Sequence, residues 1–416
     1  MNALLCPRWC SVRPAWLVFP TSASPVLIIR HARSLFPFSF VLLETSISPH
    51  VIQVLYLMQR SRSLPIKPSF RPSLSQLHRP HSTPGGPSDP SLSGIYAWFD
   101  IPYHHDHLSP LPPDPKHHLD VFLSSSGPFP RRPQPVFLFV HGGLWMRGDR
   151  RHPYRPHLYS NVGLACARAN VVGVVISYRL APAVTVMEQV RDVRRALEWT
   201  HKEVGRFGGD PGRIFLGGVS AGAHLCATLL TEERSEIKNK GVQGFVGLSG
   251  VYNIERLWRL GGGGGGEGEG ERGGEGGGRG GLGLSSMMIP MIFGDDETNW
   301  PRASPVHAIR RARRRREEGG EAGSGGSSAA LELVPLLLLN AERDFHLNED
   351  TEELLKELRG GREGGDVERA RAVVPGTDHL SLVEGLGAKR GKEEEGREGE
   401  RSVLEDLVFS FIHRHA

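Results

Sequence analysis

The sequence contains little cysteine, and the few cysteines form neither a metal-binding nor a disulfide pattern. Among 416 residues only Cys6, Cys10, Cys166 and Cys226 occur. None of their spacings fits a zinc site, and they do not suggest a disulfide framework. Cys166 and Cys226 lie in apolar helical patterns, where a reduced cysteine packs as a small hydrophobic residue. We therefore expect free, structural thiols in a reducing compartment.

Long hydrophobic runs and N-terminal acidic residues are also lacking. The apolar runs at 16–29 and 35–43 are interrupted by Pro and Ser, and neither reaches the ~20 residues of a membrane-spanning helix. Up to residue 90 only Glu44 and Asp89 are acidic, while Arg and Ser are frequent. This profile is typical of an organelle transit peptide. We predict a transit-like or disordered leader and linker over 1–93, directed to a mitochondrion or plastid. Membrane association through this segment is the competing interpretation, and otherwise the protein would be cytoplasmic.

The charge pattern gives no indication of nucleic-acid binding. The net charge is only +4, and the basic residues form no helical stripe with interleaved aromatics. Several histidines gather in a Pro-rich stretch, but no cysteine or paired acid accompanies them at a ligand spacing; they are His104, His105, His107, His117 and His118. We predict solvated loop histidines there, no metal site, no cofactor and no nucleic-acid partner.

What the chain does contain is a globular composition, with 38% hydrophobic and 23% charged residues. Short apolar runs that fit buried strands alternate with helical patterns, which predicts an α/β fold with a mostly parallel sheet covered by helices on both faces. The expected strands are 119–123, 136–140, 171–177, 214–216, 245–248, 336–339 and 372–374, with helices at 187–204 and 402–413. This domain is predicted to span 94–416, with low-complexity surface inserts at 261–283, 310–328 and 385–401.

The most informative stretch joins a buried strand to a helix through Gly218, Ser220 and Gly222. A strand–turn–helix context with this glycine spacing is typical of a nucleophile elbow. The sharp turn brings the backbone before the serine close to the backbone after it, so side chains at 218 and 222 would clash. We predict that Ser220 projects its hydroxyl from the edge of the sheet as a nucleophile.

A second glycine motif follows the predicted strand 136–140 directly and contains His141, Gly142 and Gly143. Hydrolysis of an ester or amide develops negative charge on the carbonyl oxygen, and preorganised backbone N–H groups stabilise that oxyanion. The predicted donors are the N–H groups of Gly142, Gly143 and Ala221, the last being the residue after the nucleophile. Leu144 and Trp145 are predicted to line the substrate pocket together with the apolar stretch 287–293.

A serine hydroxyl needs a base to remove its proton, and the base needs an acid to orient it. Asp344 follows the predicted strand 336–339, and His379 follows the next one, 372–374. Residues after successive parallel strands meet at one edge of the sheet, so we predict Asp344 as the acid and His379 as the base. Other candidates for these two roles remain at this stage; they are Glu342 and Asp350 for the acid and His346 for the base.

Five motifs, taken together, resemble the hormone-sensitive-lipase-like branch of the α/β-hydrolase superfamily; they lie at 141–145, 177–182, 209–214, 218–224 and 376–379. Within this branch the chain is similar to isoprenylcysteine methylesterases, and next to kynurenine formamidases. Val219 departs from both families, which usually carry a polar residue before the serine. The resemblance implies that Ser220, Asp344 and His379 are nucleophile, acid and base.

The motifs thus predict a serine hydrolase that cleaves a carboxylic ester through an acyl-enzyme. Its partner is a small ester or amide of apolar character, and a prenylcysteine methyl ester is one candidate. Two alternatives use the same fold. One is an arylformamidase acting on N-formylkynurenine, and the other is a ligand-binding receptor that performs no catalysis.

Overall fold

The computed structural model describes residues 94–416 with gaps. The gaps are 106–112, 126–131, 153, 156, 233–236, 238, 261–287, 295–296, 319–330, 332–333, 360–367 and 388–401. The predicted leader at 1–93, with its targeting and membrane interpretations, and the predicted insert at 261–283 therefore lie outside the described residues.

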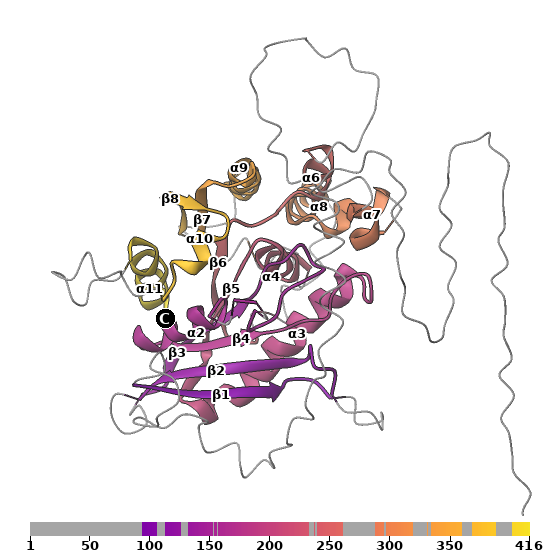
Figure 1. The fold of residues 1–416 in the computed structure, drawn as a ribbon. Helices are drawn as coiled ribbons and strands as arrows, with labels where there is room; N and C mark the ends of the chain where they lie inside the picture. The colour runs from indigo at the N-terminus through magenta and orange to yellow at the C-terminus, as the bar shows by residue number, and fades with distance from the viewer. Residues whose placement is uncertain are drawn as a thin grey trace, which may run out of the picture. The chain divides into compact units, whose positions relative to one another are not determined.

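The core of the fold is one eight-stranded sheet with the order β1-β2-β4-β3-β5-β6-β7-β8 (Figure 1). β2 pairs antiparallel with both β1 and β4, and all the other neighbours are parallel. The strands are β1 (Ile95–Pro102), β2 (His118–Ser124), β3 (Gln134–Val140), β4 (Val172–Ile176), β5 (Gly209–Val219), β6 (Val242–Leu248), β7 (Leu336–Arg343) and β8 (Arg369–Asp378). The predicted mostly parallel sheet is confirmed, as are the seven predicted strands.

Helices cover both faces of the sheet. One hydrophobic cluster joins the sheet to α3 and α4, and a second joins its other face to α2 and α11 (Figure 1). The helical segments are α2 (Ser160–Arg168), α3 (Val186–Glu203), η2 (Val204–Phe207), α4 (Ala221–Glu232), α6 (Ile254–Leu260), α7 (Met288–Phe293), η3 (Glu297–Ala303), α8 (Pro305–Glu317), α9 (Leu347–Arg359), α10 (Ser381–Glu384) and α11 (Val403–His415).

Strand β3 illustrates why this sequence forms a central strand. Side chains of a strand point alternately to the two faces. Val136, Leu138 and Val140 belong to the cluster with α3 and α4, whereas Phe137 and Phe139 belong to the cluster with α2 and α11. A strand that is buried on both faces needs a continuous apolar run rather than an alternating one.

The N-terminus of α3 is fixed by a capping box. The Thr185 hydroxyl accepts a hydrogen bond from the Glu188 N–H, and the Glu188 carboxylate accepts one from the Thr185 N–H. These two bonds satisfy backbone donors that a helix start otherwise leaves unpaired. Ser402 and Glu405 form the same arrangement at the start of α11.

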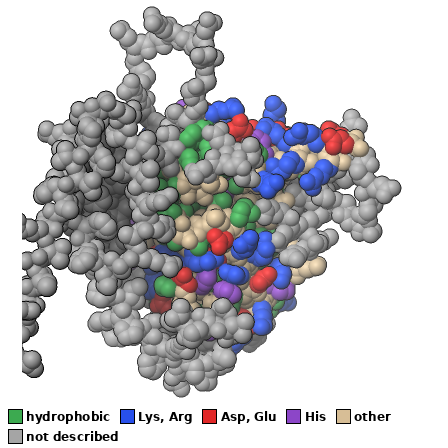
Figure 2. All heavy atoms as spheres, turned by 90° about the vertical axis from the view of Figure 1, so that its right-hand side faces the viewer, with side chains coloured by type: hydrophobic (Ala, Val, Ile, Leu, Met, Phe, Trp, Pro, Cys, Tyr) green, Lys and Arg blue, Asp and Glu red, His purple; other side chains and the backbone are tan. Residues whose placement is uncertain are grey.

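The predicted insert at 310–328 is partly wrong, because helix α8 continues to Glu317. Arg310 pairs with Glu353 and Glu357 on α9, and Arg313 also pairs with Glu357. These ion pairs order an arginine run whose composition alone indicates disorder. On the face shown in Figure 2, Lys and Arg side chains likewise lie among Asp and Glu side chains.

The cysteine prediction is confirmed for the two cysteines that the structure describes. Cys166 and Cys226 are free and buried, and burial raises the pKa of each thiol. His117 is not a solvated loop histidine, because it is buried and its Nε2 lies 3.0 Å from Asp192 Oδ1. Across the described segments, no group of three or more acidic, Cys or His residues is arranged to hold a metal, and no helix is long and apolar enough to cross a membrane.

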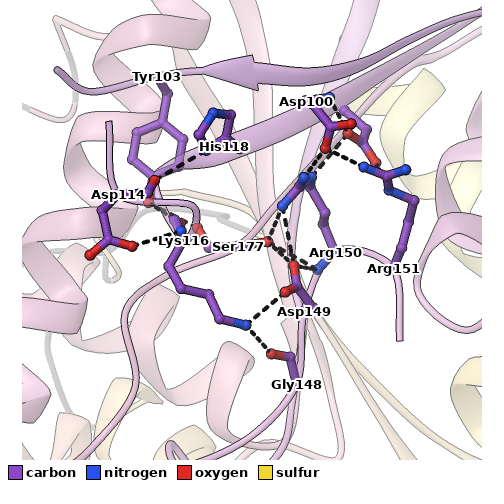
Figure 3. Close-up of polar contacts among 11 residues, drawn as sticks. Asp100, Tyr103, Asp114, Lys116, His118, Gly148, Asp149, Arg150, Arg151 and Ser177 are labelled. Carbon is purple, nitrogen blue, oxygen red and sulfur yellow. Dashed lines mark hydrogen bonds and ion pairs between the residues drawn. The ribbon is translucent and has the colours of Figure 1, made fainter. Parts of the chain in front are cut away.

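A network of charges fastens residues 148–151, which follow the glycine motif at 141–143, to the edge of the sheet (Figure 3). The guanidinium of Arg150 donates to Asp120 Oδ1 at 3.0 Å and to Ser177 Oγ at 2.9 Å. Lys116 Nζ donates to Asp149 Oδ2 at 2.7 Å and to the Gly148 carbonyl oxygen at 2.8 Å. Burial alone would raise the pKa of Asp149, but Lys116 and Arg150 outweigh it and lower that pKa to about 2.

We predict that Arg150→Met lowers the free energy of unfolding by about 3 kcal/mol, because it removes a buried partner of the buried Asp120 carboxylate. Arg151→Met is the matched control. Arg151 also pairs with Asp120, but 39% of its side chain is exposed, against 10% for Arg150, so its loss should cost less than about 1 kcal/mol. Urea unfolding of both variants measures the difference, and equal losses would contradict the interpretation.

Candidate active site

All the candidate site residues follow the carboxyl ends of parallel strands. His141 follows β3, Ser220 follows β5, Asp344 follows β7 and His379 follows β8. The strand register aligns these ends, because Val140 pairs with Gly218 and Arg343 pairs with Asp378. Four segments that are far apart in sequence thereby converge on one edge of the sheet.

The turn between β5 and α4 has the geometry that its glycines predict. Ser220 has a φ of 56°, a left-handed conformation that is uncommon outside glycine. A Cβ at Gly218 would lie 2.6 Å from the Gly222 carbonyl carbon, and a Cβ at Gly222 would lie 2.5 Å from the His141 carbonyl oxygen. The first distance is the predicted clash across the turn. The second adds a constraint from β3, which the motif alone does not indicate.

The loop after β3 lies against this turn. A Cβ at Gly142 would lie only 3.3 Å from the Ser220 Cβ, and Gly143 has a φ of 123°. The Tyr159 hydroxyl oxygen accepts a hydrogen bond from the Gly142 N–H, so the loop presents its backbone donors on the side of the serine turn. Backbone N–H groups beside a serine are the donors that an oxyanion requires.

His141 stiffens the start of the loop. Its ring stacks on Tyr178 with centroids 4.4 Å apart, and its Nδ1 donates to the Gly142 carbonyl oxygen at 2.7 Å. Burial lowers the pKa of His141 to about 4, so the imidazole is neutral at physiological pH. It braces the loop without adding a charge.

The predicted acid and base are in direct contact. His379 Nδ1 donates to Asp344 Oδ1 at 2.8 Å, which leaves Nε2 as the unprotonated nitrogen that can accept a proton. The Asp344 side chain is fully buried, whereas 21% of the His379 side chain is exposed. Between Ser220 Oγ and His379, both among the described residues, no hydrogen bond forms. In ligand-free sites such bonds are often long and tighten when substrate binds.

Asn340 is a residue of this site to which the sequence analysis gives no role. It lies fully buried near the end of β7, and its Nδ2 donates to Asp344 Oδ2 at 2.8 Å. Both carboxylate oxygens are therefore engaged, one by the base and one by the amide. The only indication of Asn340 in the sequence is that this polar residue directly follows the apolar run 336–339.

The alternative acids and base have other partners. Glu342 accepts from the Gly376 N–H at 2.8 Å, and the buried Asp350 accepts from the N–H groups of Tyr252 and Asn253. His346 lies on the surface, with 60% of its side chain exposed and Glu349 beside it. The geometry thus favours Asp344 and His379 over these candidates.

The predicted pocket residues differ in accessibility. Leu144 is half-buried, but Trp145 is fully buried, so its ring offers no surface to a ligand. Its indole packs edge-to-face on Phe293 of α7, with centroids 4.9 Å apart. The exposed apolar surface near the base comes instead from Phe345, which is 42% exposed and lies 5.5 Å from the His379 ring between centroids.

Sheet order, elbow and loop together define an α/β-hydrolase fold. A family model described as the alpha/beta hydrolase fold matches residues 137–259. Crystal structures of esterase B from Lactobacillus rhamnosis share this fold; one gives a TM-score of 0.52 at 17% identity and covers 77% of this chain and 87% of the esterase. The chain is an α/β-hydrolase-fold protein.

Two relatives in sequence make the resemblance more specific. A probable isoprenylcysteine alpha-carbonyl methylesterase of Oryza sativa subsp. japonica is 32% identical over 152 residues, which are 34% of each chain. A probable carboxylic ester hydrolase of Mycobacterium tuberculosis, LipM, is 32% identical over 157 residues, which are 34% of this chain and 33% of the relative. The match thus spans about a third of each relative. Over that third the chain is similar to a methylesterase and to a carboxylic ester hydrolase.

We predict that Gly222→Ala destabilises the protein by about 1–3 kcal/mol or more, because the added methyl group meets the backbone carbonyls of Val140 and His141. Gly205→Ala is the matched control, since a Cβ there has nothing within 4 Å. Thermal and urea unfolding should separate the two variants. Equal stability of the two variants would show that the end of β3 shifts at little cost and that the turn at Ser220 is not tightly packed.

Proposed function

We propose that this chain is a serine carboxylic-ester hydrolase in which Ser220 is the nucleophile, His379 the general base and Asp344 the acid that orients it. The observation that carries the proposal is the hydrogen bond between His379 and Asp344 at the sheet edge where Ser220 sits in its elbow. The chain order of serine, acid and histidine matches that of α/β-hydrolases.

The first half-reaction forms an acyl-enzyme. His379 Nε2 takes the proton from Ser220 Oγ as this oxygen attacks the ester carbonyl carbon. The carbonyl π electrons move to the oxygen, and the N–H groups of Gly142, Gly143 and Ala221 stabilise the resulting oxyanion. When the tetrahedral intermediate collapses, the bond to the alkoxy group breaks and His379 returns its proton to the departing alcohol.

The second half-reaction restores the enzyme. Water attacks the acyl carbon while His379 removes a proton from it, and the Ser220 oxygen leaves with that proton. The products are a carboxylic acid and free Ser220. The buried Asp344 carboxylate favours the imidazolium of each transition state, and Asn340 keeps that carboxylate in the required plane.

We predict that Ser220→Ala lowers kcat/KM for a short p-nitrophenyl ester by ~10³-fold or more and abolishes covalent labelling by a fluorophosphonate probe. Thr231→Ala on α4, the helix that follows Ser220, is the control and should retain full activity, because Thr231 Oγ1 donates to the Thr228 carbonyl oxygen at the far end of that helix. Circular dichroism shows whether both variants fold. Turnover in Ser220→Ala like that of the wild type would refute the assignment.

We further propose that the ester carries an apolar group, with a prenylcysteine methyl ester as the candidate. Support comes from the relative named as an isoprenylcysteine methylesterase and from exposed apolar surface on Phe345 and Met291. Phe345 lies beside the base, so an apolar acyl or prenyl group at this position would bury its ring. Burying a phenyl ring contributes about 2 kcal/mol.

We predict for the full chain a higher kcat/KM with a farnesylcysteine methyl ester than with p-nitrophenyl acetate, and that Phe345→Ala raises KM roughly tenfold for the farnesyl substrate alone. Tyr154→Ala is the control, because this exposed aromatic residue lies in another loop. Faster cleavage of N-formylkynurenine would favour the arylformamidase instead. Tight ligand binding without probe labelling would favour the receptor.

A further inference from the structure

His224 is a fully buried imidazole one helical turn after Ser220. Its backbone N–H donates to the Ser220 carbonyl oxygen at 3.1 Å, so the residue is tied directly to the elbow. Its side chain makes polar contacts with two segments that lie outside its own helix.

The two ring nitrogens of His224 have different partners, and this difference fixes the tautomer. The Trp145 indole Nε1 can only donate, so His224 Nδ1 accepts its hydrogen bond at 3.1 Å. The Ala303 carbonyl oxygen can only accept, so His224 Nε2 donates to it at 2.7 Å. The bond from Trp145 requires an unprotonated Nδ1 and hence a neutral ring, and burial lowers the pKa of His224 to about 4.

Trp145 connects this histidine to the oxyanion loop. It lies two residues after Gly143 and has a φ of 59°. Its carbonyl oxygen accepts hydrogen bonds from Gln189 Nε2 at 2.8 Å and from the Ala181 N–H at 3.0 Å. The indole bond to His224 is the contact that joins the loop to the helix carrying Ala221.

We propose that His224 is a positioning residue of the active site: through Trp145 it holds the N–H groups of Gly142 and Gly143 at a fixed distance from that of Ala221. The inference rests on the proposed hydrolase function, because it concerns the same oxyanion donors. These donors belong to two separate segments, and stabilisation of the oxyanion requires all of them to point at one oxygen. The second bond, to Ala303, fixes the end of η3 against the same ring.

Packing alone does not explain an imidazole at this position. Most neighbouring buried residues of α4 are apolar, including Leu225, Cys226 and Leu229, and the buried Thr228 places its Oγ1 3.4 Å from His224 Nε2. Burying a polar ring costs free energy that its hydrogen bonds must offset, whereas an apolar side chain of similar volume would fill the space without that requirement. The imidazole instead joins α4 to Trp145 and to Ala303 by two hydrogen bonds of fixed direction.

The test compares His224→Phe, which keeps a ring but removes both bonds, with Trp145→Phe and the double variant. We expect each single variant to lower kcat for a p-nitrophenyl ester about 10- to 100-fold with little change in KM. Affinity for phenylboronic acid, which forms a tetrahedral adduct on serine, should fall in parallel. The double variant should lose no more than the worse single variant, because the two residues act as a unit.

Cys226→Ala is the matched control for a buried residue on the same helix. It should lower Tm but leave kcat and boronate affinity unchanged. His224→Asn provides a second measurement if His224→Phe folds poorly, because its amide oxygen can accept the Trp145 bond and should restore part of kcat.

The outcomes separate this inference from the function on which it rests. If His224→Phe lowers Tm like Cys226→Ala but keeps full kcat and boronate affinity, His224 only packs and the inference is wrong. Strictly additive losses in the double variant would also overturn it. If the wild type neither hydrolyses esters nor reacts with a fluorophosphonate, the proposed function fails first, and this role fails with it.

Discussion

The site depends on the close approach of two backbones, the turn between β5 and α4 and the end of β3. Gly222 lies so near the carbonyls of Val140 and His141 that no side chain fits there. This approach brings the loop at Gly142 against the turn at Ser220, although 77 residues separate Gly142 from Ser220 in the sequence. A parallel sheet makes it possible, because the ends of adjacent strands meet at one edge.

Much of this arrangement could be predicted from local sequence pattern. The apolar runs indicate the strands, since a strand buried on both faces must be apolar throughout. β1 was not predicted; its apolar run is interrupted by Asp100 and ends in Pro102, and the pairing register shifts between Trp98 and Ile101. The helical part of the arginine run was missed for a different reason. Arg310 and Arg313 are ordered by Glu353 and Glu357 from another helix, and such partners are visible only in three dimensions.

At the site, too, the features that could not be predicted depend on contacts between distant segments. The placement of Ser220, Asp344 and His379 at one edge of the sheet could be predicted because each residue follows a recognisable strand or turn. Asn340 and His224 could not be given roles, because their contacts with Asp344, Trp145 and Ala303 depend on tertiary packing. For Trp145 the sequence predicts a role in the pocket that the structure does not support. A tryptophan beside an oxyanion loop suggests a pocket wall, yet its ring is fully buried and its N–H is directed inward.

Three histidines near the site, His141, His224 and His379, differ in burial and in their hydrogen-bond partners. His141 and His224 are fully buried, and burial lowers the pKa of each to about 4, so both stay neutral and hold their hydrogen bonds at physiological pH. His379 differs because its ring is partly exposed and has a buried carboxylate on one side. In the proposed mechanism His379 gains and loses a proton in each cycle and has the Asp344 carboxylate as its counter-charge. Protonation of His224 at Nδ1, by contrast, would break the bond that this nitrogen accepts from Trp145, so burial of the neutral ring preserves that contact.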